Sequence, residues 1–318
     1  MNSHEPIFSQ CSKCQHLIHH DAKVCSFCKS PNPIKNGHSQ YEINFLNQKE
    51  IKTISHHWKF DFLSDTGKVR EKNEDSLIGF SIPFQEPNGS FSETHFLLVC
   101  DGMGGAAAGE IASKTTVHSI TRYFISQLQE YPVSDFSGNI FPLMKISIQY
   151  ANEVLLKKTS LNPDLTGMGT TAVLAFLYKN QVFFGHVGDS RLYWISQKKI
   201  TQITEDHSLF NALLKQGSVK ESDRNTFTQK NVITQALGVS AEIDLDLSSE
   251  GKNPLSVSKN DFILLASDGL TGHLNDQEIL EIIKQNKPIS SLCKELIDEA
   301  NRRGGKDNIS VILAQYLG

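Results

Sequence analysis

The sequence lacks a long hydrophobic run. Its most apolar segment, residues 96–100, has the length of a strand, whereas a membrane-spanning helix needs ~18–20 consecutive apolar residues. Residues 1–10 also lack the basic start and the apolar stretch of a secretory signal peptide. We therefore expect a cytoplasmic protein with no membrane partner.

A large excess of either charge is missing as well. The 318-residue chain has 31 Lys and Arg residues against 35 Asp and Glu residues, which gives a formal net charge of −4. This balance argues against the broad basic field that holds nucleic acid and against an acidic disordered tail. No basic stripe is interleaved with aromatic residues, so we expect no nucleic-acid partner and no nuclease activity.

Cysteine is scarce and is concentrated near the N-terminus. Four of the six cysteines form two Cys-x-x-Cys pairs separated by ten residues, Cys11 with Cys14 and Cys25 with Cys28. Four soft thiolates in a tetrahedron favour Zn²⁺. Unligated thiols or a redox pair are the alternatives, although a thioredoxin-like motif needs a βαβ setting that the surrounding sequence does not suggest. The spacing predicts one structural Zn²⁺ in a zinc ribbon at residues 1–33.

The chain then changes composition twice. Residues 34–56 are mostly polar and include Asn36 and Gly37, which is typical of a linker. Apolar runs bounded by Gly, Asp, Asn or Lys recur after residue 57. The sequence thus predicts a small unit, a linker and one large domain at residues 57–318.

Both helices and strands are expected in the large domain. Apolar, β-branched or aromatic runs predict strands at residues 95–100, 171–177, 182–187, 191–195, 262–266 and 309–315. Apolar residues at helical spacing predict helices at residues 110–128, 141–158, 276–283 and 289–301. Strands in groups, with helices between the groups, indicate a layered α+β sandwich rather than an alternating βαβ fold.

Carboxylates stand beside such apolar runs at four places. Asp101 and Asp268 each end a run and precede a glycine, Asp307 stands just before another, and Glu74 and Asp75 stand before a fourth. Any single Asp-Gly can be merely a turn. Four carboxylate positions at the ends of buried strands would repel one another unless a cation neutralised them, and hard oxygen ligands suit Mg²⁺ or Mn²⁺. The pattern therefore predicts a metal centre.

Arg70 lies four residues before Glu74. Its planar guanidinium could hold a phosphoryl group in a bidentate manner. A solvated surface charge is the alternative for an arginine between Val69 and Glu71.

Short motifs occur in a fixed order over residues 57–318. In chain order they are Ser64-Asp65-Thr66-Gly67, Arg70, Asn73-Glu74-Asp75, Asp101-Gly102-Met103-Gly104-Gly105, Met168-Gly169-Thr170-Thr171, Gly185-His186-Val187-Gly188-Asp189-Ser190-Arg191, Asp206-His207-Ser208, Ile233-Thr234-Gln235-Ala236-Leu237-Gly238, Ser267-Asp268-Gly269-Leu270 and Gly305-Lys306-Asp307-Asn308. Individually they are weak signals. Together they resemble the motifs of bacterial metal-dependent serine/threonine protein phosphatases of type 2C, the PPM family.

The resemblance implies a four-layer αββα sandwich with two Mn²⁺ or Mg²⁺ ions at one end of the stacked sheets. It implies that Asp101 bridges both ions and that Asp268 and Asp307 complete the ligands of the first. Glu74 and the Gly102 carbonyl match the ligands of the second ion.

The resemblance assigns further roles around these ligands. Asp75 matches a residue that contacts the second ion through water, and Arg70 matches the arginine that binds the phosphoryl group. Residues 208–231 match a flap beside the cleft.

Two positions depart from the family pattern. Met103 stands where animal members have a histidine proposed as general acid, and we do not transfer that role to His207. Thr166 stands where bacterial members commonly have an aspartate that contributes to a third metal, so a third ion is in doubt, although Asp164 is near in sequence.

The implied activity is hydrolysis of phosphoserine and phosphothreonine in proteins. The expected partners are phosphorylated proteins, a Ser/Thr kinase or its targets among them, and the expected state is a monomer. The alternative is a catalytically weak phosphoprotein-binding module that docks through the zinc ribbon. Clustered carboxylates favour catalysis, because a binding module does not need them.

Overall fold

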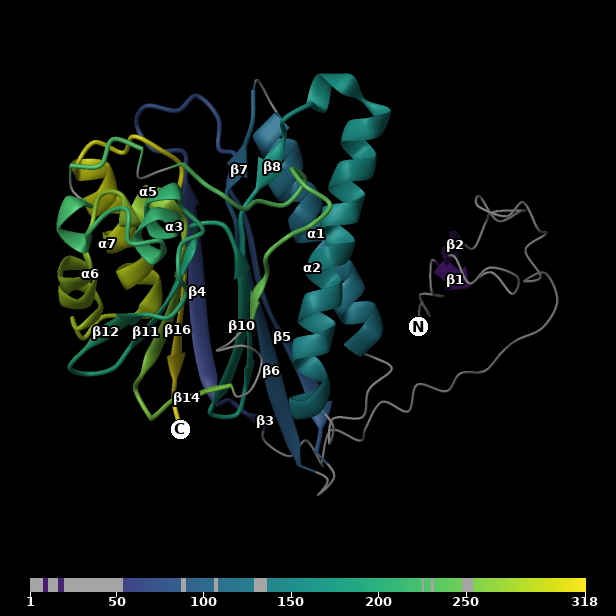
Figure 1. The fold of residues 1–318 in the computed structure, drawn as a ribbon. Coiled ribbons are helices and arrows are strands. Elements are labelled where there is room, and N and C mark those ends of the chain that lie inside the picture. The colour runs from purple at the N-terminus through teal and green to yellow at the C-terminus, as the bar shows by residue number, and fades with distance from the viewer. Residues whose placement is uncertain are drawn as a thin grey trace. The chain divides into compact units, whose positions relative to one another are not determined.

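The computed structural model describes residues 8–10, 17–19, 54–86, 90–105, 108–128, 136–224, 226–229, 232–247 and 254–318 (Figure 1). The chain divides into two compact units, Met1–Ile51 and Lys52–Gly318. In the first unit, β1 (Phe8–Gln10) pairs antiparallel with β2 (Leu17–His19). The predicted zinc ligands Cys11, Cys14, Cys25 and Cys28 lie outside the described residues.

The described residues of the second unit form two large, mostly antiparallel sheets. The first sheet has the strands β3 (Ile54–Ser55), β5 (Ser76–Gln85), β6 (Phe91–Cys100), β9 (Ala172–Tyr178), β10 (Gln181–Val187), β13 (Asp246–Leu247) and β14 (Leu255–Ser256). The second sheet has the order β12 (Ile200–Gln202), β11 (Arg191–Ile195), β15 (Phe262–Ala266), β16 (Ile309–Tyr316) and β4 (Trp58–Asp65). β3, within the range predicted as linker, runs parallel to β6.

Successive residues of the central strands face different cores, because side chains alternate across a strand. In β6, Phe96 and Leu98 pack on the helix side of the sheet, whereas Leu97 and Val99 pack between the two sheets. Both sides are buried, so apolar residues occupy consecutive positions over residues 96–100 of β6.

Helices cover the outer face of each sheet, and the result is four layers (Figure 1). α1 (Ala108–Leu128) and α2 (Phe136–Leu161) pack on the first sheet. α6 (Asp276–Ile283) and α7 (Ile289–Arg302) pack on the second. The layered α+β sandwich expected from the sequence is confirmed. No helix in the described ranges combines the length and apolarity needed to cross a membrane.

Short elements complete the fold. β7 (Gly102–Met103) pairs with β8 (Gly169–Thr170), and α5 (Asp268–Thr271) starts directly after β15. The segment predicted as a flap contains α3 (Leu209–Lys215) and the short 3-10 helix η4 (Glu221–Asp223). Another 3-10 helix, η3 (Pro163–Leu165), follows α2.

Candidate active site

The strand register places the predicted carboxylates at one end of both sheets. Ser76 stands opposite Cys100, so Asp75 and Asp101 leave the first sheet side by side. Ala266 stands opposite Val311, so Asp268 and Asp307 leave the second sheet together. Because these residues come from four different strands, the sequence alone could not show how they meet.

The carboxylates repel one another. Burial, together with the charges of Asp75 and Asp268, raises the pKa of Asp101 well above its usual range. Burial and the charge of Asp307 also raise the pKa of Asp268. Burial raises the pKa of Glu74 as well, although Arg70 opposes that rise. A divalent cation among these groups would relieve both the repulsion and the loss of water.

Asp75 is the most enclosed acid among the predicted ligands. It is 7% exposed, and burial raises its pKa to about 7. The Ser267 hydroxyl donates a 2.8 Å hydrogen bond to Asp75 Oδ2, whereas Oδ1 has no partner within the described residues. An unpartnered buried oxygen next to other carboxylates is what a metal-bound water would satisfy.

Asp189 belongs to the cluster, but we assigned it no role from the sequence. It lies just beyond β10 at the same end of the sheets, is 8% exposed, and has an unpartnered Oδ1 among the described groups. Burial and then the charge of Asp268 raise its pKa to about 7. The available signal was the same as for Asp101 and Asp268, a strand that ends at an aspartate.

Two threonine side chains hold the backbone of Asp101 in place. Its N–H donates to Thr171 Oγ1 at 3.0 Å, and its carbonyl accepts from Thr170 Oγ1 at 2.8 Å. Gly102 follows in a tight space, where a Cβ would collide with the backbone carbonyls of Gly109 and Glu74. Only glycine therefore lets this turn pack against the loop that carries Glu74.

Asn308 ties the second sheet to the loop that carries Arg70 and Glu74. Its side-chain amide donates to the carbonyls of Thr66 at 2.9 Å and Lys72 at 2.8 Å. Its side-chain oxygen accepts the Glu74 N–H at 2.7 Å. The side chain is buried, so these three bonds hold both ends of the loop in a fixed place.

Arg70 points at the cluster. Its Nη2 donates to Asp307 Oδ2 at 2.7 Å, with the Arg70 side chain 50% exposed. The hydrogen bond and charge of Asp307 raise the pKa of Arg70, and the charges of Glu74 and Asp101 add to this effect. A half-exposed guanidinium at the edge of the carboxylates can meet an incoming anion.

The donor set fits Mg²⁺ or Mn²⁺. All the side-chain donors are carboxylate oxygens, which these hard cations prefer. Within the described ranges, no three His, Cys, Asp or Glu side chains stand together as a compact ion cage. Mg²⁺ usually keeps several water ligands, so water and backbone oxygen would complete a coordination shell here.

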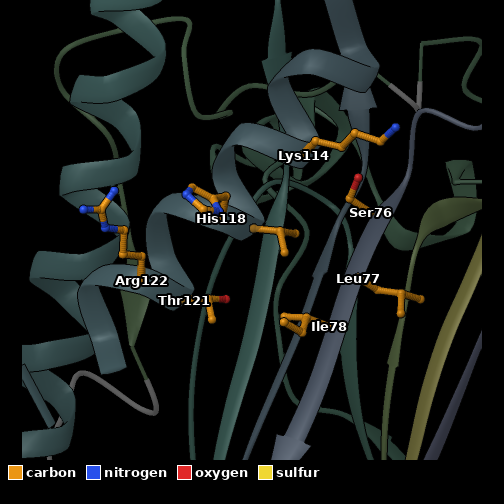
Figure 2. Close-up of a pocket in the computed structure, with 8 residues that line it drawn as sticks. Ser76, Leu77, Ile78, Lys114, His118, Thr121 and Arg122 are labelled. Carbon is orange, nitrogen blue, oxygen red and sulfur yellow. The ribbon is translucent and has the colours of Figure 1, made fainter. Parts of the chain in front are cut away.

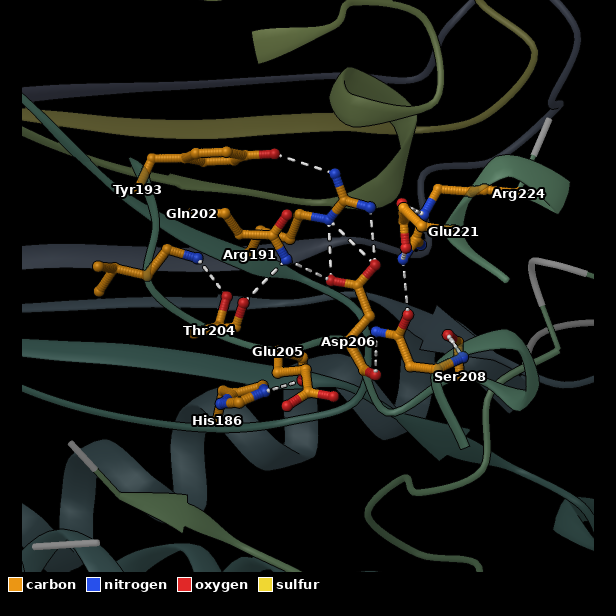
Figure 3. A network of polar contacts seen from close by, with 12 residues as sticks. His186, Arg191, Tyr193, Gln202, Thr204, Glu205, Asp206, Ser208, Glu221 and Arg224 are labelled. Atoms are coloured by element: carbon orange, nitrogen blue, oxygen red, sulfur yellow. Dashed lines mark hydrogen bonds and ion pairs between the residues drawn. The ribbon is translucent and has the colours of Figure 1, made fainter. Parts of the chain in front are cut away.

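A second polar network supports the base of the predicted flap (Figure 3). Arg191 donates to both carboxylate oxygens of Asp206, at 2.9 Å and 2.7 Å. The Asp206 carbonyl accepts from the Asn211 side chain in α3 at 2.9 Å, and Asn211 accepts from Arg224 at 3.0 Å. The guanidinium carbon of Arg224 also lies over the Phe210 ring, 4.4 Å from its centroid. The network links the second sheet to the segment at residues 208–231.

The residues at the two departures are also placed. Met103 pairs with Gly169 in the β7–β8 ladder beside Asp101. Thr166 caps η3, and Asp164 is exposed within η3. His207 stacks on His186 with ring centroids 4.6 Å apart, and its Nδ1 accepts the Gly188 N–H.

The remaining cysteines are packing residues. Cys100 and Cys293 are buried, each within an apolar cluster. Burial raises the pKa of the Cys100 thiol well above its usual range and that of Cys293 to about 12. Both thiols are therefore protonated at neutral pH and act as packing groups in the core.

The family model described as protein phosphatase 2C matches residues 62–213 and 248–309. The chain belongs to this family. The serine/threonine phosphatase stp of Listeria welshimeri is 33% identical over 255 residues, covering 80% of this chain and 94% of the relative. This relationship makes the chain a metal-dependent protein-serine/threonine phosphatase.

Solved structures agree with this assignment. The serine/threonine phosphatase of S. agalactiae has a TM-score of 0.68 and 32% identity, and the match covers 82% of this chain and 100% of that one. The catalytic domain of the phosphatase PstP in complex with 2 manganese ions has a TM-score of 0.65 and 28% identity, over 82% of this chain and 99% of that one.

Proposed function

We propose that this chain removes phosphate from phosphoserine and phosphothreonine in proteins at the carboxylate cluster at one end of its two sheets. The observation that carries the proposal is the meeting of Asp75, Asp101, Asp268 and Asp307 at one end of the fold. Burial and the charges of neighbouring carboxylates raise the pKa of Asp75, Asp101 and Asp268 there. Such a cluster costs stability without a cation, so its presence favours catalysis over a binding-only role.

The proposed ligands of two Mn²⁺ or Mg²⁺ ions follow from the resemblance and from the donors at the site. Asp101 would contact both ions, Asp268 and Asp307 would hold one, and Glu74 with the Gly102 carbonyl would hold the other. Asp75 would hold water at the second ion through its unpartnered Oδ1. When bound, two such ions lower the pKa of a water molecule and stabilise negative charge on phosphoryl oxygens.

Arg70 would position the phosphoryl group. Its guanidinium donates to Asp307 Oδ2 and is half exposed, so an incoming phosphoryl oxygen can reach it. Asn308 would keep Arg70 and Glu74 in register by holding the loop between them. We assign no proton transfer to His207, because burial lowers its pKa to about 4 and its Nδ1 is engaged by Gly188.

Turnover of p-nitrophenyl phosphate tests this function. We expect Mn²⁺-dependent hydrolysis by the full chain and a rate near background for Asp101→Asn, which keeps the shape of the side chain but removes its charge. If the wild-type and Asp101→Asn proteins hydrolyse the compound at equal rates, and both unfold at the same temperature, the assignment is refuted. The binding-only alternative requires that outcome.

We also propose that residues 1–33 form a zinc ribbon, that residues 34–56 link it to the phosphatase domain at residues 57–318, and that the ribbon acts as a docking element. Support comes from the spacing of Cys11, Cys14, Cys25 and Cys28. We expect one Zn per chain by elemental analysis and loss of it in Cys11→Ser/Cys14→Ser. Deletion of residues 1–33 should leave p-nitrophenyl phosphate turnover nearly intact. A zinc-free wild-type protein would contradict the ribbon.

The substrates proposed for this chain are the products of Ser/Thr kinases, or such a kinase itself. This follows from the reaction alone, since a kinase must supply every phosphorylated side chain that the enzyme hydrolyses. Monomeric state and cytoplasmic location stay predictions.

A further inference from the structure

We propose that a groove between α1 and β5 binds the stretch of substrate next to the phosphorylated residue and favours acidic residues there. This inference rests on the proposed function and adds a substrate preference to it. The groove has a volume of about 480 Å³ and lies between residues 76–78 of β5 and one face of α1 (Figure 2).

The groove begins at the active site. β5 starts at Ser76, the residue directly after Asp75, so the strand leads away from the carboxylates. The first turn of α1 touches the same place, since a Cβ on Gly109 would lie 2.9 Å from the Glu74 carboxyl carbon. Substrate that extends from a phosphoresidue at the cluster therefore has the groove as a direct continuation.

Basic side chains line the α1 wall. Lys114, His118 and Arg122 follow at intervals of four residues, and all three are exposed on the same face of the helix (Figure 2). Lys72 adds positive charge between this row and the site. The pKa of Glu110 is lowered mainly by Lys114 and to a smaller extent by Lys72. Among the described residues, one acidic side chain forms an ion pair with this row: Glu110 Oε1 lies 2.6 Å from Lys114 Nζ.

The opposite wall can pair with an extended peptide. Among the described strands, β5 has β6 as its only partner in the sheet, so its outer edge is open. Pro83 lies toward the far end of β5, which leaves the half near the site free of proline. Thr121 also lines this groove from the α1 side.

The dimensions fit a short peptide segment. From Lys114 to Arg122 the helix rises ~12 Å, and an extended chain covers that length with about four residues. Acidic side chains on such a segment would stand opposite the basic row, while Val117 and Leu77 would contact its apolar parts. A phosphorylated substrate that carries an acidic flank is the occupant that this charge pattern favours.

Peptide kinetics test the proposal. Phosphothreonine peptides are compared that carry about four Glu residues, or the same number of Gln residues, on the N-terminal or the C-terminal side. At low salt we expect kcat/KM to be about five-fold higher for one Glu peptide than for its Gln counterpart, because each exposed ion pair contributes little. Higher salt should reduce that ratio toward one. Equal values for Glu and Gln peptides on both sides would overturn the proposal.

Variants locate the effect in the groove. Lys114→Gln/Arg122→Gln should bring the Glu-to-Gln ratio close to one. The matched control Lys284→Gln/Lys294→Gln removes two exposed charges from the helices on the other sheet and should keep the wild-type ratio. A ratio that the groove variant keeps, or that the control variant loses equally, would contradict the location. Unfolding temperatures of both variants show whether each is folded.

Failure of the function can be told apart from failure of the groove. If the wild-type chain hydrolyses neither peptide nor p-nitrophenyl phosphate with Mn²⁺, the proposed function fails. The groove is then tested by fluorescence polarisation with labelled Glu and Gln peptides on the same protein. Tighter binding of the Glu peptide, lost in Lys114→Gln/Arg122→Gln, would support the groove, and equal binding would refute it.

Discussion

Replacing Asn308 by alanine tests how the site is held together. The substitution removes two hydrogen bonds donated to Thr66 and Lys72 and one accepted from the Glu74 N–H. At about 1 kcal/mol each, their loss should lower the free energy of unfolding by about 3 kcal/mol. For a unit of this size that corresponds to a fall in unfolding temperature of roughly 6–12 °C.

The same substitution should weaken metal binding. Glu74 is held through its backbone by Asn308, and loss of a partner that orients a ligand typically costs ~10–100-fold in metal affinity. The Mn²⁺ concentration for half-maximal turnover of p-nitrophenyl phosphate should therefore rise, measured well below the unfolding temperature. This readout separates a positioning role from a merely structural one.

Asn275→Ala is the matched control. Asn275 caps α6 by accepting the Glu278 N–H, so its loss should cost about 1 kcal/mol of stability and leave the Mn²⁺ requirement as in wild type. If Asn308→Ala unfolded at the wild-type temperature with an unchanged Mn²⁺ requirement, Asn308 would not hold the loop at residues 66–74.

Two further predictions concern charge. Burial raises the pKa of Asp75 and Asp189 to about 7 in the fold, above the value near 4 of an unfolded chain. Protonation of these two groups stabilises the fold fully below about pH 4, and this stabilisation is lost as the pH rises through about 7. With a chelator present, the unfolding temperature should therefore be higher at about pH 5.5 than at about pH 8. Asp189→Asn should reduce that difference, and an unchanged difference would contradict the raised pKa. Arg191→Met should lower the free energy of unfolding in urea by about 3 kcal/mol or more, because Asp206 stays buried without its charged partner, whereas a loss below about 1 kcal/mol would contradict this role.

Local patterns predicted the helices and central strands well. Helix α6 begins and ends where the apolar spacing placed it, because Asn275 and Glu278 form a capping box at its start. The strand β15 was equally clear, since it is a short apolar run followed by Asp268 and Gly269. In both elements the signal is confined to neighbouring residues, which a sequence displays directly.

Contacts between distant residues were not predictable from such patterns. β3 is only two residues long and pairs with β6 across 37 residues, so no periodicity marks it. Asn308 reads as a turn residue until the fold places it against Glu74, 234 residues away. Asp189 was quoted within a motif, but its burial beside Asp268 comes from the register of β11 on β15.

The resemblance to type 2C phosphatases predicted more of the site than residue types and spacing did. Residue types alone indicated a cation among carboxylates and left Arg70 open between a surface charge and a phosphate ligand. The structure places Arg70 against Asp307, which brings it to the cluster. Its role toward phosphate, and the division of ligands between two ions, stay predictions that metal titration and variants address.

Phosphate release from a phosphothreonine peptide, followed as Mn²⁺ is titrated, is the decisive measurement for metal-dependent catalysis at the carboxylate cluster. We expect turnover by the wild-type chain to rise with Mn²⁺, to disappear with excess chelator, and to be near background in Asp268→Asn at every Mn²⁺ concentration. Turnover that persists in the chelator, or an Asp268→Asn protein as active as wild type, would contradict catalysis by metal ions held in the carboxylate cluster.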